Sequence, residues 1–335
     1  MKKVAVVILN WNGKDFLEKF LPSVTKFNND FTDIIVADNA STDDSINFIK
    51  NNYPTIKLII NDKNYGFAKG YNEALKHVDS EYAVLLNSDV EVTQNWIEPI
   101  IELMDADKTI AACQPKIRDY NNPKYFEYAG AAGGFIDYLG YPFCRGRIFN
   151  HLEEDKGQYD DVKEIFWATG ACMFVRMDYY NNVGGLDNFF FAHMEEIDLC
   201  WRFKNLGYKI MYIPNSTVYH VGGGTLNKIK PQKTFLNYRN NLFLLHKNLS
   251  PKIRNWILLQ RLVLDGVAGI KLLLEGKPKH TLAIIKAHFA FYKNIKQNKN
   301  KRQNVSNPNL TGIFNKSVLV KSFVEKKHTY IALIS

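Results

Sequence analysis

Three groups of polar residues in this sequence have types and spacings that suit metal or acid–base chemistry. The first is Asn87-Ser88-Asp89, which follows the apolar run at 83–86. Asn87 and Asp89 stand two residues apart, so their side-chain oxygens can share one hard cation such as Mg²⁺ or Mn²⁺, which prefers oxygen ligands. Asn, Ser and Asp between a strand and a helix are also typical helix caps. The triplet alone therefore leaves both a metal site and a cap open.

The second group is a run of acids, Glu195-Glu196-Ile197-Asp198, with Arg202 one turn later. On a helix, Glu195, Asp198 and Arg202 share one side, and the spacing of Asp198 and Arg202 fits a surface ion pair. Glu196 points in another direction, and a carboxylate in a cleft can accept a proton from an attacking hydroxyl. The alternative explanation is that acids are favoured at helix N-termini by the helix dipole.

The third group is His220, which precedes Val221 and the triplet Gly222-Gly223-Gly224. A lone histidine is usually a structural residue, although histidine is also a common metal ligand. Glycines beside it allow the backbone to approach a phosphate or a metal closely. His220 is therefore a candidate ligand.

The elements that must position these groups alternate between strands and helices over the first 117 residues. Apolar strands are expected at 4–9, 34–37, 56–60, 83–86 and 110–117, separated by amphipathic helices, the last of them capped by Thr93 and running to 104. Such alternation predicts right-handed crossovers and a mostly parallel α/β sheet.

The rest of the chain changes character twice. Residues 118–163 are rich in Gly, Tyr, Asn and Pro, which predicts a long, ordered functional loop. Short strands are expected next, at 165–168, 172–175 and 209–213. From 235 onward the pattern predicts amphipathic helices, and the apolar segment 318–324 fits either a strand or a helix.

Polar residues follow four of the expected strands. They are Asn10 with Asn12, Asp38 with Asn39, Asn64, and Asn87 with Asp89. Because ligands of open α/β sheets bind beyond the carboxyl ends of the strands, these residues predict a nucleotide-binding cleft. Asp38 would accept from a base N–H, and Gly66 at a helix N-terminus would accommodate a phosphate. The absence of G-x-G-x-x-G after the first strand and of G-x-x-x-x-G-K-[ST] disfavours dinucleotide redox enzymes and P-loop NTPases.

Composition and charge indicate a folded protein with a distinct C-terminal part. The chain has 335 residues, 46% of them apolar and 13% aromatic, which suits two domains or one large domain with an appendage. Four cysteines without a C-x-x-C pair suit reduced thiols of a cytosolic protein. The net charge is +9, but residues 226–335 hold 21 Lys and Arg against 3 Asp and Glu. This asymmetry predicts an anionic partner, either a membrane or a nucleic acid.

Neither apolar segment that could enter a membrane is expected to do so as a span. The N-terminal apolar run stops at Asn10 and is too short for a secretory signal. The segment 256–274 is interrupted by Arg261, Asp265 and Lys271, so a transmembrane helix is not expected.

Several of these motifs together resemble the family 2 glycosyltransferases of GT-A fold. The resembling segments are V-V-I-L-N-W-N-G (6–13), V-A-D-N-A-S-T-D (36–43), N-Y-G-F-A-K-G-Y-N (64–72), L-L-N-S-D-V (85–90), G-G-L-D (184–187), E-E-I-D-L-C-W-R (195–202) and Y-H-V-G-G-G (219–224). They run in order across residues 4–245. The chain is most similar to the branch of rhamnosyl- and galactofuranosyltransferases that build bacterial surface polysaccharides.

The resemblance implies a role for each group of site residues. Donor binding falls to Asn10, Asn12, Asp38, Asn64, Gly66, Asn87 and Asp89, with Asp38 on the nucleobase. The metal, Mg²⁺ or Mn²⁺, falls to Asp89 with His220 and Asn87. Glu196 is the implied general base, with Glu195 as its neighbour in the acid pair. The acceptor side falls to Trp167, Thr169, Gly170, Asp198 and the 118–163 loop. Arg239-Asn240 matches a frequent pair to which the resemblance assigns no role.

The expected protein is therefore an inverting, metal-dependent glycosyltransferase. It would move a sugar from a UDP- or dTDP-linked donor to a hydroxyl of a lipid-linked surface polysaccharide. Residues 1–230 would form the catalytic domain, and the basic helical region 231–335 would attach to the anionic inner face of the cytoplasmic membrane.

Two other classes of protein are weighed against this expectation. A nucleotidyltransferase that makes sugar nucleotides would have a Gly-rich loop with Arg or Lys after the first strand, where this chain has Asn10-Trp11-Asn12-Gly13. A nucleic-acid-binding protein could use the basic region on phosphates, but it would leave the strand-end motifs unexplained. No nucleic-acid partner is expected, and the oligomeric state stays open.

Overall fold

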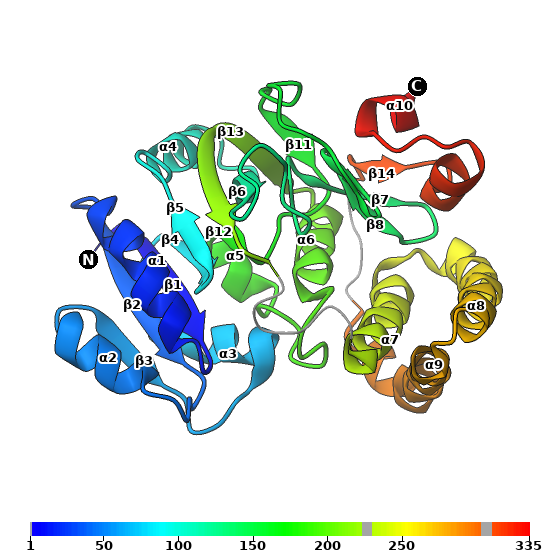
Figure 1. Cartoon of the computed structure of the whole chain (residues 1–335), viewed down its shortest axis with the longest axis horizontal. Helices are drawn as coiled ribbons and strands as arrows, with labels where there is room; N and C mark the ends of the chain where they lie inside the picture. The colour runs from blue at the N-terminus through cyan, green and yellow to red at the C-terminus, as the bar shows by residue number, and fades with distance from the viewer. Residues whose placement is uncertain (1, 223–229, 303–309) are drawn as a thin grey trace.

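A computed structural model describes residues 2–222, 230–302 and 310–335, and within them a mixed nine-stranded sheet forms the centre of the molecule (Figure 1). The strand order is β11-β13-β6-β12-β4-β1-β2-β3, and β5 pairs with β13. The strands are β1 Val4–Asn10, β2 Thr32–Asp38, β3 Lys57–Ile60, β4 Tyr82–Asn87, β5 Val90–Val92, β6 Ile110–Asp119, β11 Lys163–Ile165, β12 Cys172–Arg176 and β13 Lys209–His220. The predicted α/β class is confirmed.

Strands β1 to β4 form the predicted parallel half of the sheet. They are connected by α1 (Lys14–Lys26), α2 (Ser45–Asn52) and α3 (Gly66–Leu75). Alternate residues of β1 enter different cores, because successive side chains of a strand point to opposite faces. Val4, Val6 and Ile8 pack with α1, whereas Ala5 and Val7 pack with α3. Both faces of β1 are therefore covered by helices.

The register of these strands brings their polar ends to one edge. Asn10 lies opposite Asp38 in the β1–β2 pair, and Leu9 lies opposite Asn87 in the β1–β4 pair. This confirms that the polar residues after these strands lie side by side.

The other half of the sheet differs from a simple parallel sheet. β12 lies between β4 and β6 and is antiparallel to both, so a late strand separates two early ones. The predicted cap at Thr93 is wrong, because Thr93 directly follows β5, its hydroxyl donates to the Thr217 carbonyl at 2.7 Å, and the residue before α4 is Ile97. The helix after it, α4, begins only at Glu98 and ends at Ala106.

Residues 118–163 are ordered, as predicted, and they contribute four short strands to a second sheet. Its order is β10-β9-β8-β7-β14, with β7 Gly134–Asp137, β8 Pro142–Cys144, β9 Arg147–Ile148, β10 His151–Leu152 and β14 Ile313–Phe314. β14 pairs in parallel with β7, so the end of the chain completes a sheet that begins near its middle. The division of the chain at residue 230 stays a prediction.

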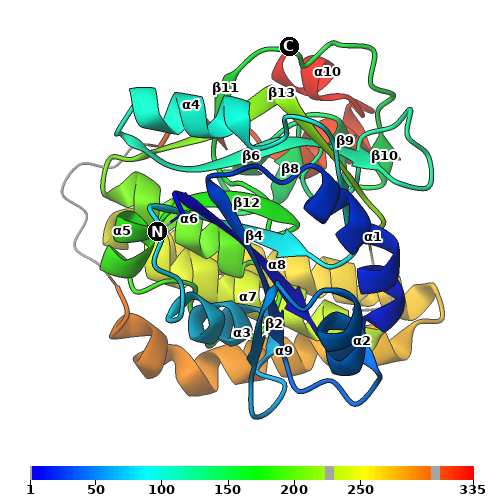
Figure 2. The same ribbon diagram turned by 90° about the vertical axis from the view of Figure 1, so that its left-hand side faces the viewer.

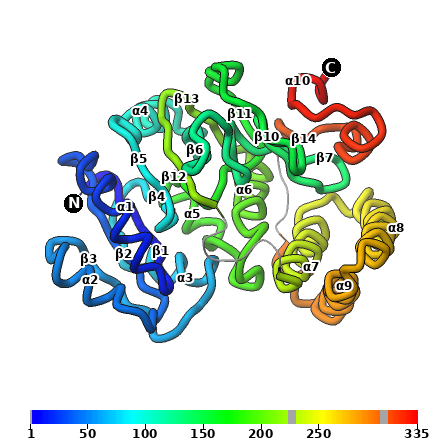
Figure 3. The backbone as a smooth tube through the Cα atoms, in the orientation of Figure 1, coloured from blue at the N-terminus to red at the C-terminus, as the bar shows by residue number. Residues whose placement is uncertain are grey.

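The C-terminal part is helical, as predicted. It contains α7 (Pro231–Asn248), α8 (Pro251–Leu274), α9 (Pro278–Lys299) and α10 (Tyr330–Ile334). The segment 318–324, for which the sequence allowed either a strand or a helix, contains a π-helical turn at Val320–Val324. The tube in Figure 3 shows α7 between α6 (Glu195–Asn205) and the pair α8–α9. Figure 1 shows α7 to α9 at the opposite end of the molecule from α1 and α2, so in the view of Figure 2 they lie behind the sheet. No helix in the described ranges has the length and apolarity needed to cross a bilayer.

Candidate active site

Asp89 and His220 meet at the end of the central strands. β5 and β13 pair antiparallel with His220 opposite Val90, which brings two distant parts of the chain together. His220 Nε2 lies 3.1 Å from Asp89 Oδ1, and the Val221 amide donates to the Asp89 carbonyl at 3.1 Å. Both side chains are buried. The predicted neighbourhood of this aspartate and this histidine is therefore present, whereas Gly223 and Gly224 lie outside the described residues.

Glu127 is a third charged residue of this cluster, and sequence reasoning missed it. Its Oε1 lies 3.4 Å from His220 Nδ1, and its Oε2 accepts the Ala129 amide at 2.5 Å. Burial lowers the pKa of His220, but the carboxylates of Glu127 and Asp89 outweigh that effect and raise it to about 10. Burial raises the pKa of Asp89, yet His220 holds it below its ordinary value. His220 is thus a cation between two anions.

The donor types of this cluster suit a divalent cation. Two carboxylates and an imidazole are ligands that Mn²⁺ and Mg²⁺ accept. A Cβ placed on Gly222, at φ +69, would lie 2.6 Å from Glu127 Oε1, so only a glycine lets the backbone come this close. Within the described residues, no three His, Cys, Asp or Glu side chains form a ready-made metal cluster. Metal binding by Asp89, Glu127 and His220 would therefore replace their mutual ion pairs, and Asn87 stands half-buried nearby at the end of β4.

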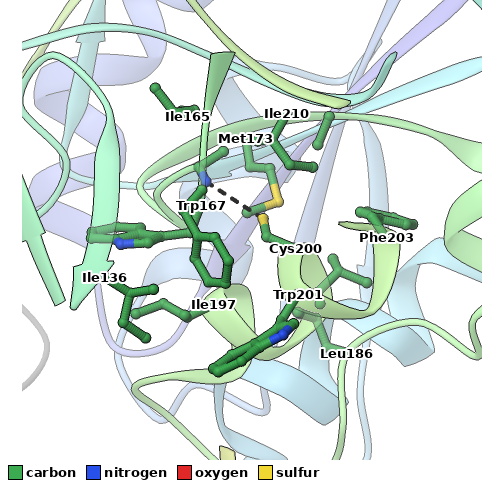
Figure 4. Packing of buried hydrophobic residues seen from close by; sticks show 14 of the residues in the cluster. Ile136, Ile165, Trp167, Met173, Leu186, Ile197, Cys200, Trp201, Phe203 and Ile210 are labelled. Atoms are coloured by element: carbon green, nitrogen blue, oxygen red, sulfur yellow. Dashed lines mark hydrogen bonds between the residues drawn. The ribbon is translucent and has the colours of Figure 1, made fainter. Parts of the chain in front are cut away.

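The two candidate bases, Glu195 and Glu196, lie in the first turn of α6. The apolar side of α6, with Ile197, Cys200 and Trp201, packs into the main core (Figure 4). Glu195 is buried, whereas Glu196 is partly exposed, and one carboxylate oxygen of each has no hydrogen-bond partner among the described residues. Burial raises the pKa of both carboxyls, and for Glu195 the charge of Glu196 adds to the effect. A partly exposed carboxylate with a raised pKa suits a general base.

Cys144 on β8 is a buried thiol. Burial raises its pKa, the charge and hydrogen bond of Arg147 oppose that rise, and the negative charges of Glu127 and Glu196 add to it. That the candidate base Glu196 and the candidate metal ligands serve one site stays a prediction.

Asp38 is the last residue of β2 and organises the polar residues at the carboxyl ends of β1 and β2, which we call the donor edge. It is only 1% exposed, and its carboxylate accepts the Asn10 amide at 2.8 Å, the Ser41 hydroxyl at 2.7 Å and the Ser41 amide at 2.7 Å. Asn12 is exposed at the rim, where its Oδ1 accepts the Thr42 amide at 2.7 Å. The structure therefore brings Asn10, Asn12 and Asp38 together, with Asn10 and Asp38 buried and Asn12 at the rim.

The predicted phosphate site at Gly66 stays a prediction, and in this structure protein groups accept the amides at the start of α3. The Gly66 amide donates to Asn64 Oδ1 at 2.8 Å, and the amides of Phe67 and Ala68 donate to the Phe191 carbonyl at 2.8 and 3.3 Å. A free helix N-terminus would be needed to hold a phosphate. Asn64, predicted to line the nucleoside pocket, is exposed, and its Oδ1 accepts the amide of Gly66, the first residue of α3.

The residues predicted on the acceptor side are buried. The Trp167 indole donates to the Phe135 carbonyl at 2.8 Å, and the Thr169 amide donates to Gln114 Oε1 at 3.0 Å. Gly170 is also buried, and a Cβ there would lie 2.9 Å from the Phe67 ring. These three residues support the site from within and do not form its surface.

Asp198 differs most from its predicted environment. The ion pair with Arg202 forms, at 2.8 Å, but it is buried and not at the surface. The same carboxylate accepts Lys247 Nζ at 2.8 Å and Asn248 Nδ2 at 2.9 Å. Its oxygens are thus occupied by α6 and α7, because α7 covers this side of α6. The predicted acceptor-side role does not fit this position.

Comparisons with known proteins agree with this architecture. A family model described as glycosyl transferase family 2 matches residues 5–184. N-acetylglucosaminyl-diphospho-decaprenol L-rhamnosyltransferase of Mycobacterium tuberculosis is 24% identical over 230 residues, which cover 64% of this chain and 75% of that protein. Rhamnosyltransferase WbbL of Escherichia coli K12 is 24% identical over 226 residues, which cover 65% of this chain and 83% of the relative.

A solved structure supports the fold. Mannosyltransferase PcManGT from Pyrobaculum calidifontis, in complex with GDP-Man and Mn²⁺, superposes with a TM-score of 0.54 at 14% identity, covering 87% of each chain. Similarity at this identity speaks for the fold alone, and it confirms the predicted GT-A architecture.

Proposed function

Because the chain belongs to glycosyltransferase family 2, we propose that it moves a sugar from a UDP- or dTDP-linked donor to a hydroxyl of a lipid-linked glycan, inverting the anomeric carbon. The observation that carries this proposal is the buried cluster of Asp89, Glu127 and His220 beyond the carboxyl end of β4. The two rhamnosyltransferase relatives make a deoxyhexose the first sugar to test.

Charge complementarity supports donor binding at this edge. The diphosphate is anionic, so the cluster of two carboxylates needs a cation between itself and the donor. A divalent cation held by Asp89, Glu127 and His220 would stabilise the negative charge that develops on the leaving diphosphate. Asn12, held by the turn at Ser41 and Thr42, would present its side-chain amide to the nucleoside, and the buried Asn10 would support this edge from within through Asp38.

Glu196 is the proposed base. It would take the proton of the acceptor hydroxyl while that oxygen attacks the anomeric carbon from the face opposite the diphosphate. The new bond forms to the acceptor oxygen, and the pair of electrons of the broken bond leaves with the diphosphate. A base in position contributes about 10²–10⁴-fold in rate.

We also propose that the chain meets its acceptor at an anionic bilayer, through α8 and α9. The side of α8 that faces the protein carries Ile257, Arg261, Asp265 and Gly269, and Arg261 pairs with Asp265 at 3.1 Å. The outward side is apolar, with exposed Trp256, Leu259, Val263, Val267, Ile270 and Leu274. A helix of a water-exposed surface has the opposite pattern, since its apolar stripe faces the core.

Exposed apolar residues of α9 extend this surface, which we name the α8–α9 apolar face. They are Leu282, Ile285, Phe289 and Tyr292, of which Phe289 is 72% exposed. The same two helices and the turn between them carry eight exposed lysines, at 252, 271, 277, 279, 286, 293, 296 and 299. Of the two acids in this part of the chain, Glu275 is exposed and Asp265 is buried. Each basic residue near an anionic membrane contributes about 1 kcal/mol of attraction. Charge therefore favours a lipid surface over a second copy of this basic chain.

A donor screen tests the proposed reaction. Purified protein would be mixed with a panel of UDP- and dTDP-linked sugars, with Mn²⁺, with Mg²⁺ or with EDTA. We expect one donor class to raise the melting temperature in a metal-dependent way and to be hydrolysed slowly without acceptor. Absence of stabilisation and of hydrolysis across the whole panel would contradict the proposal.

A further inference from the structure

The loop 189–194 has an unusual backbone directly before the candidate base. Phe191, His193 and Met194 have φ values of 66°, 69° and 71°, a left-handed conformation that is unfavourable for residues other than glycine. Met194 is the residue before α6, and its carbonyl accepts the Asp198 amide at 2.9 Å. The direction in which α6 starts, and with it the direction of Glu196, therefore depends on this loop.

A single buried side chain of α7 gathers the carbonyls of this loop. Asn240 Nδ2 lies 3.0 Å from the Phe190 carbonyl oxygen, 2.9 Å from that of Ala192 and 2.8 Å from that of His193. An amide NH₂ has two hydrogens, so three carbonyls share them. Asn240 itself is fully buried. Among the described residues, one backbone amide donates to one of these three carbonyls: the Ala192 amide donates to the Phe190 carbonyl.

Arg239 supports both the loop and Asn240. Its guanidinium donates to the carbonyls of Phe189 and Phe190 at 3.2 and 3.1 Å, and its Nε donates to Asn240 Oδ1 at 2.9 Å. The last bond fixes which end of the Asn240 amide faces the loop. The guanidinium also lies over the Phe189 ring, 5.3 Å from its centre.

The opposite side of the loop is held by the donor half of the molecule. The Phe191 carbonyl accepts the first amides of α3, and a Cβ on Gly66 would lie 2.5 Å from the Phe191 ring. The loop is therefore fixed between α3, next to the donor edge, and α7. Backbone strain persists where the surroundings over-determine it, and such sites are often functional.

We propose that Arg239 and Asn240 are positioning residues that hold the 189–194 loop so that Glu196 points at the acceptor hydroxyl. This inference rests on the proposed function and extends it to two residues of α7. It gives a role to an Arg-Asn pair that follows the donor-binding part of the chain by more than a hundred residues.

The substitution Asn240→Asp tests the role with little change in shape. Its oxygens can still accept from Arg239, which favours folding, but a carboxylate donates no hydrogen bond to the three carbonyls. The matched control is Asn241→Asp on the same helix. Asn241 is also buried, yet it holds the Gly140 carbonyl at 2.6 Å and accepts from Arg261.

We expect kcat of Asn240→Asp to fall about 10- to 100-fold, since a misplacement of about 1 Å costs rate on this scale. The donor KM should stay near that of the unaltered protein, because the donor edge does not contact Asn240. Hydrogen exchange of the amides of residues 189–198 should become faster. Arg239→Lys, which keeps the charge but loses the planar fork, should fall between the unaltered protein and Asn240→Asp in both measurements.

Each outcome decides between the alternatives. An unchanged kcat, unchanged exchange in the loop, or an equal fall of kcat in Asn241→Asp would overturn the positioning role. If kcat of Asn240→Asp and the fraction of that variant able to bind donor fell by the same factor, the role of Asn240 would be merely structural. If the unaltered protein transfers no sugar at all, the proposed function fails, and faster loop exchange in Asn240→Asp alone would then leave only the structural part of the inference standing.

Discussion

His220 Nε2 lies 3.1 Å from Asp89 Oδ1, although the two residues are 131 positions apart in the chain. The pairing of β5 with β13 creates this contact, and Glu127, from the segment between β6 and β7, joins it from the other side of the imidazole. Three charges from three segments thus meet beyond the carboxyl end of β4, and the ligands of open α/β sheets bind beyond the carboxyl ends of the strands.

Replacing Asp89 by Asn should remove the metal-dependent part of donor binding. The amide keeps the size of the side chain but loses its charge, and a hard cation binds a neutral oxygen more weakly. We expect the affinity for a nucleoside diphosphate with Mn²⁺, measured by calorimetry, to fall by about tenfold or more. Glu91→Gln on the neighbouring strand is the control, and equal affinities in the two variants would count against Asp89 as a ligand.

Replacing Glu127 by Gln should lower the pKa of His220, because the imidazolium loses one of two adjacent carboxylates. The pKa in the folded protein is about 10, above the ordinary 6.5. Charged His220 therefore stabilises the metal-free fold fully below pH 6.5, and this stabilisation is lost as the pH rises toward 10. We expect the melting temperature in EDTA to decline over this range, and to decline less in Glu127→Gln. Parallel declines in both proteins would exclude the coupling.

Replacing Glu196 by Gln should abolish most transfer and leave the donor bound. The amide cannot accept the hydroxyl proton, so kcat should fall by about 10²–10⁴-fold. Glu195→Gln provides the comparison, since Glu195 is buried and should affect the rate less. Calorimetric titration with nucleoside diphosphate verifies that both variants still bind. A larger loss in Glu195→Gln would transfer the role of base to Glu195.

The raised pKa of Glu196 also predicts that activity and stability change in opposite directions as the pH rises. Burial raises this pKa above the ordinary value of 4.5, so the folded state prefers the protonated carboxyl and loses stability as the pH rises and the group ionises. The rate should rise over the same pH range, because only the ionised form is a base. Glu196→Gln should melt at a higher temperature than the unaltered protein at pH 8, by about 2–4 °C per kcal/mol gained. A lower melting temperature would show that the ionised carboxylate has partners.

The α8–α9 apolar face should bind vesicles that contain anionic phosphatidylglycerol. The double substitution Val263→Glu and Val267→Glu puts two negative charges on the face. We expect the fraction of protein that sediments with the vesicles to fall by more than tenfold. The fall has two causes: apolar burial worth about 25 cal/mol per Å² is lost, and the anionic lipid repels the new carboxylates. Val162→Glu, at an exposed valine before β11, is the control. If vesicles do not bind but a dimer is lost in the double variant, the face is an interface between copies of the chain.

The local pattern of the sequence determined the parallel half of the sheet, the helices around it and the position of the polar strand ends. The alternation of apolar residues in β1 and their helical spacing in α1 depend only on the geometry of one element. Both can therefore be recognised from the sequence alone. The motifs shared with the family extended this to Asp89, His220 and Glu196, and the structure brings Asp89 next to His220.

The tertiary structure alone decided which distant elements meet. β12 enters the sheet between β4 and β6, Glu127 reaches His220 from a segment without periodicity, and the Phe191 carbonyl occupies the start of α3. The last contact is made by a backbone oxygen, which every residue has and no side-chain pattern records. Asp198 likewise changed from an expected surface pair to a buried one because α7 covers it. Local periodicity fixes an element and its two faces, whereas burial and long-range hydrogen bonds depend on the partner that packs against each face.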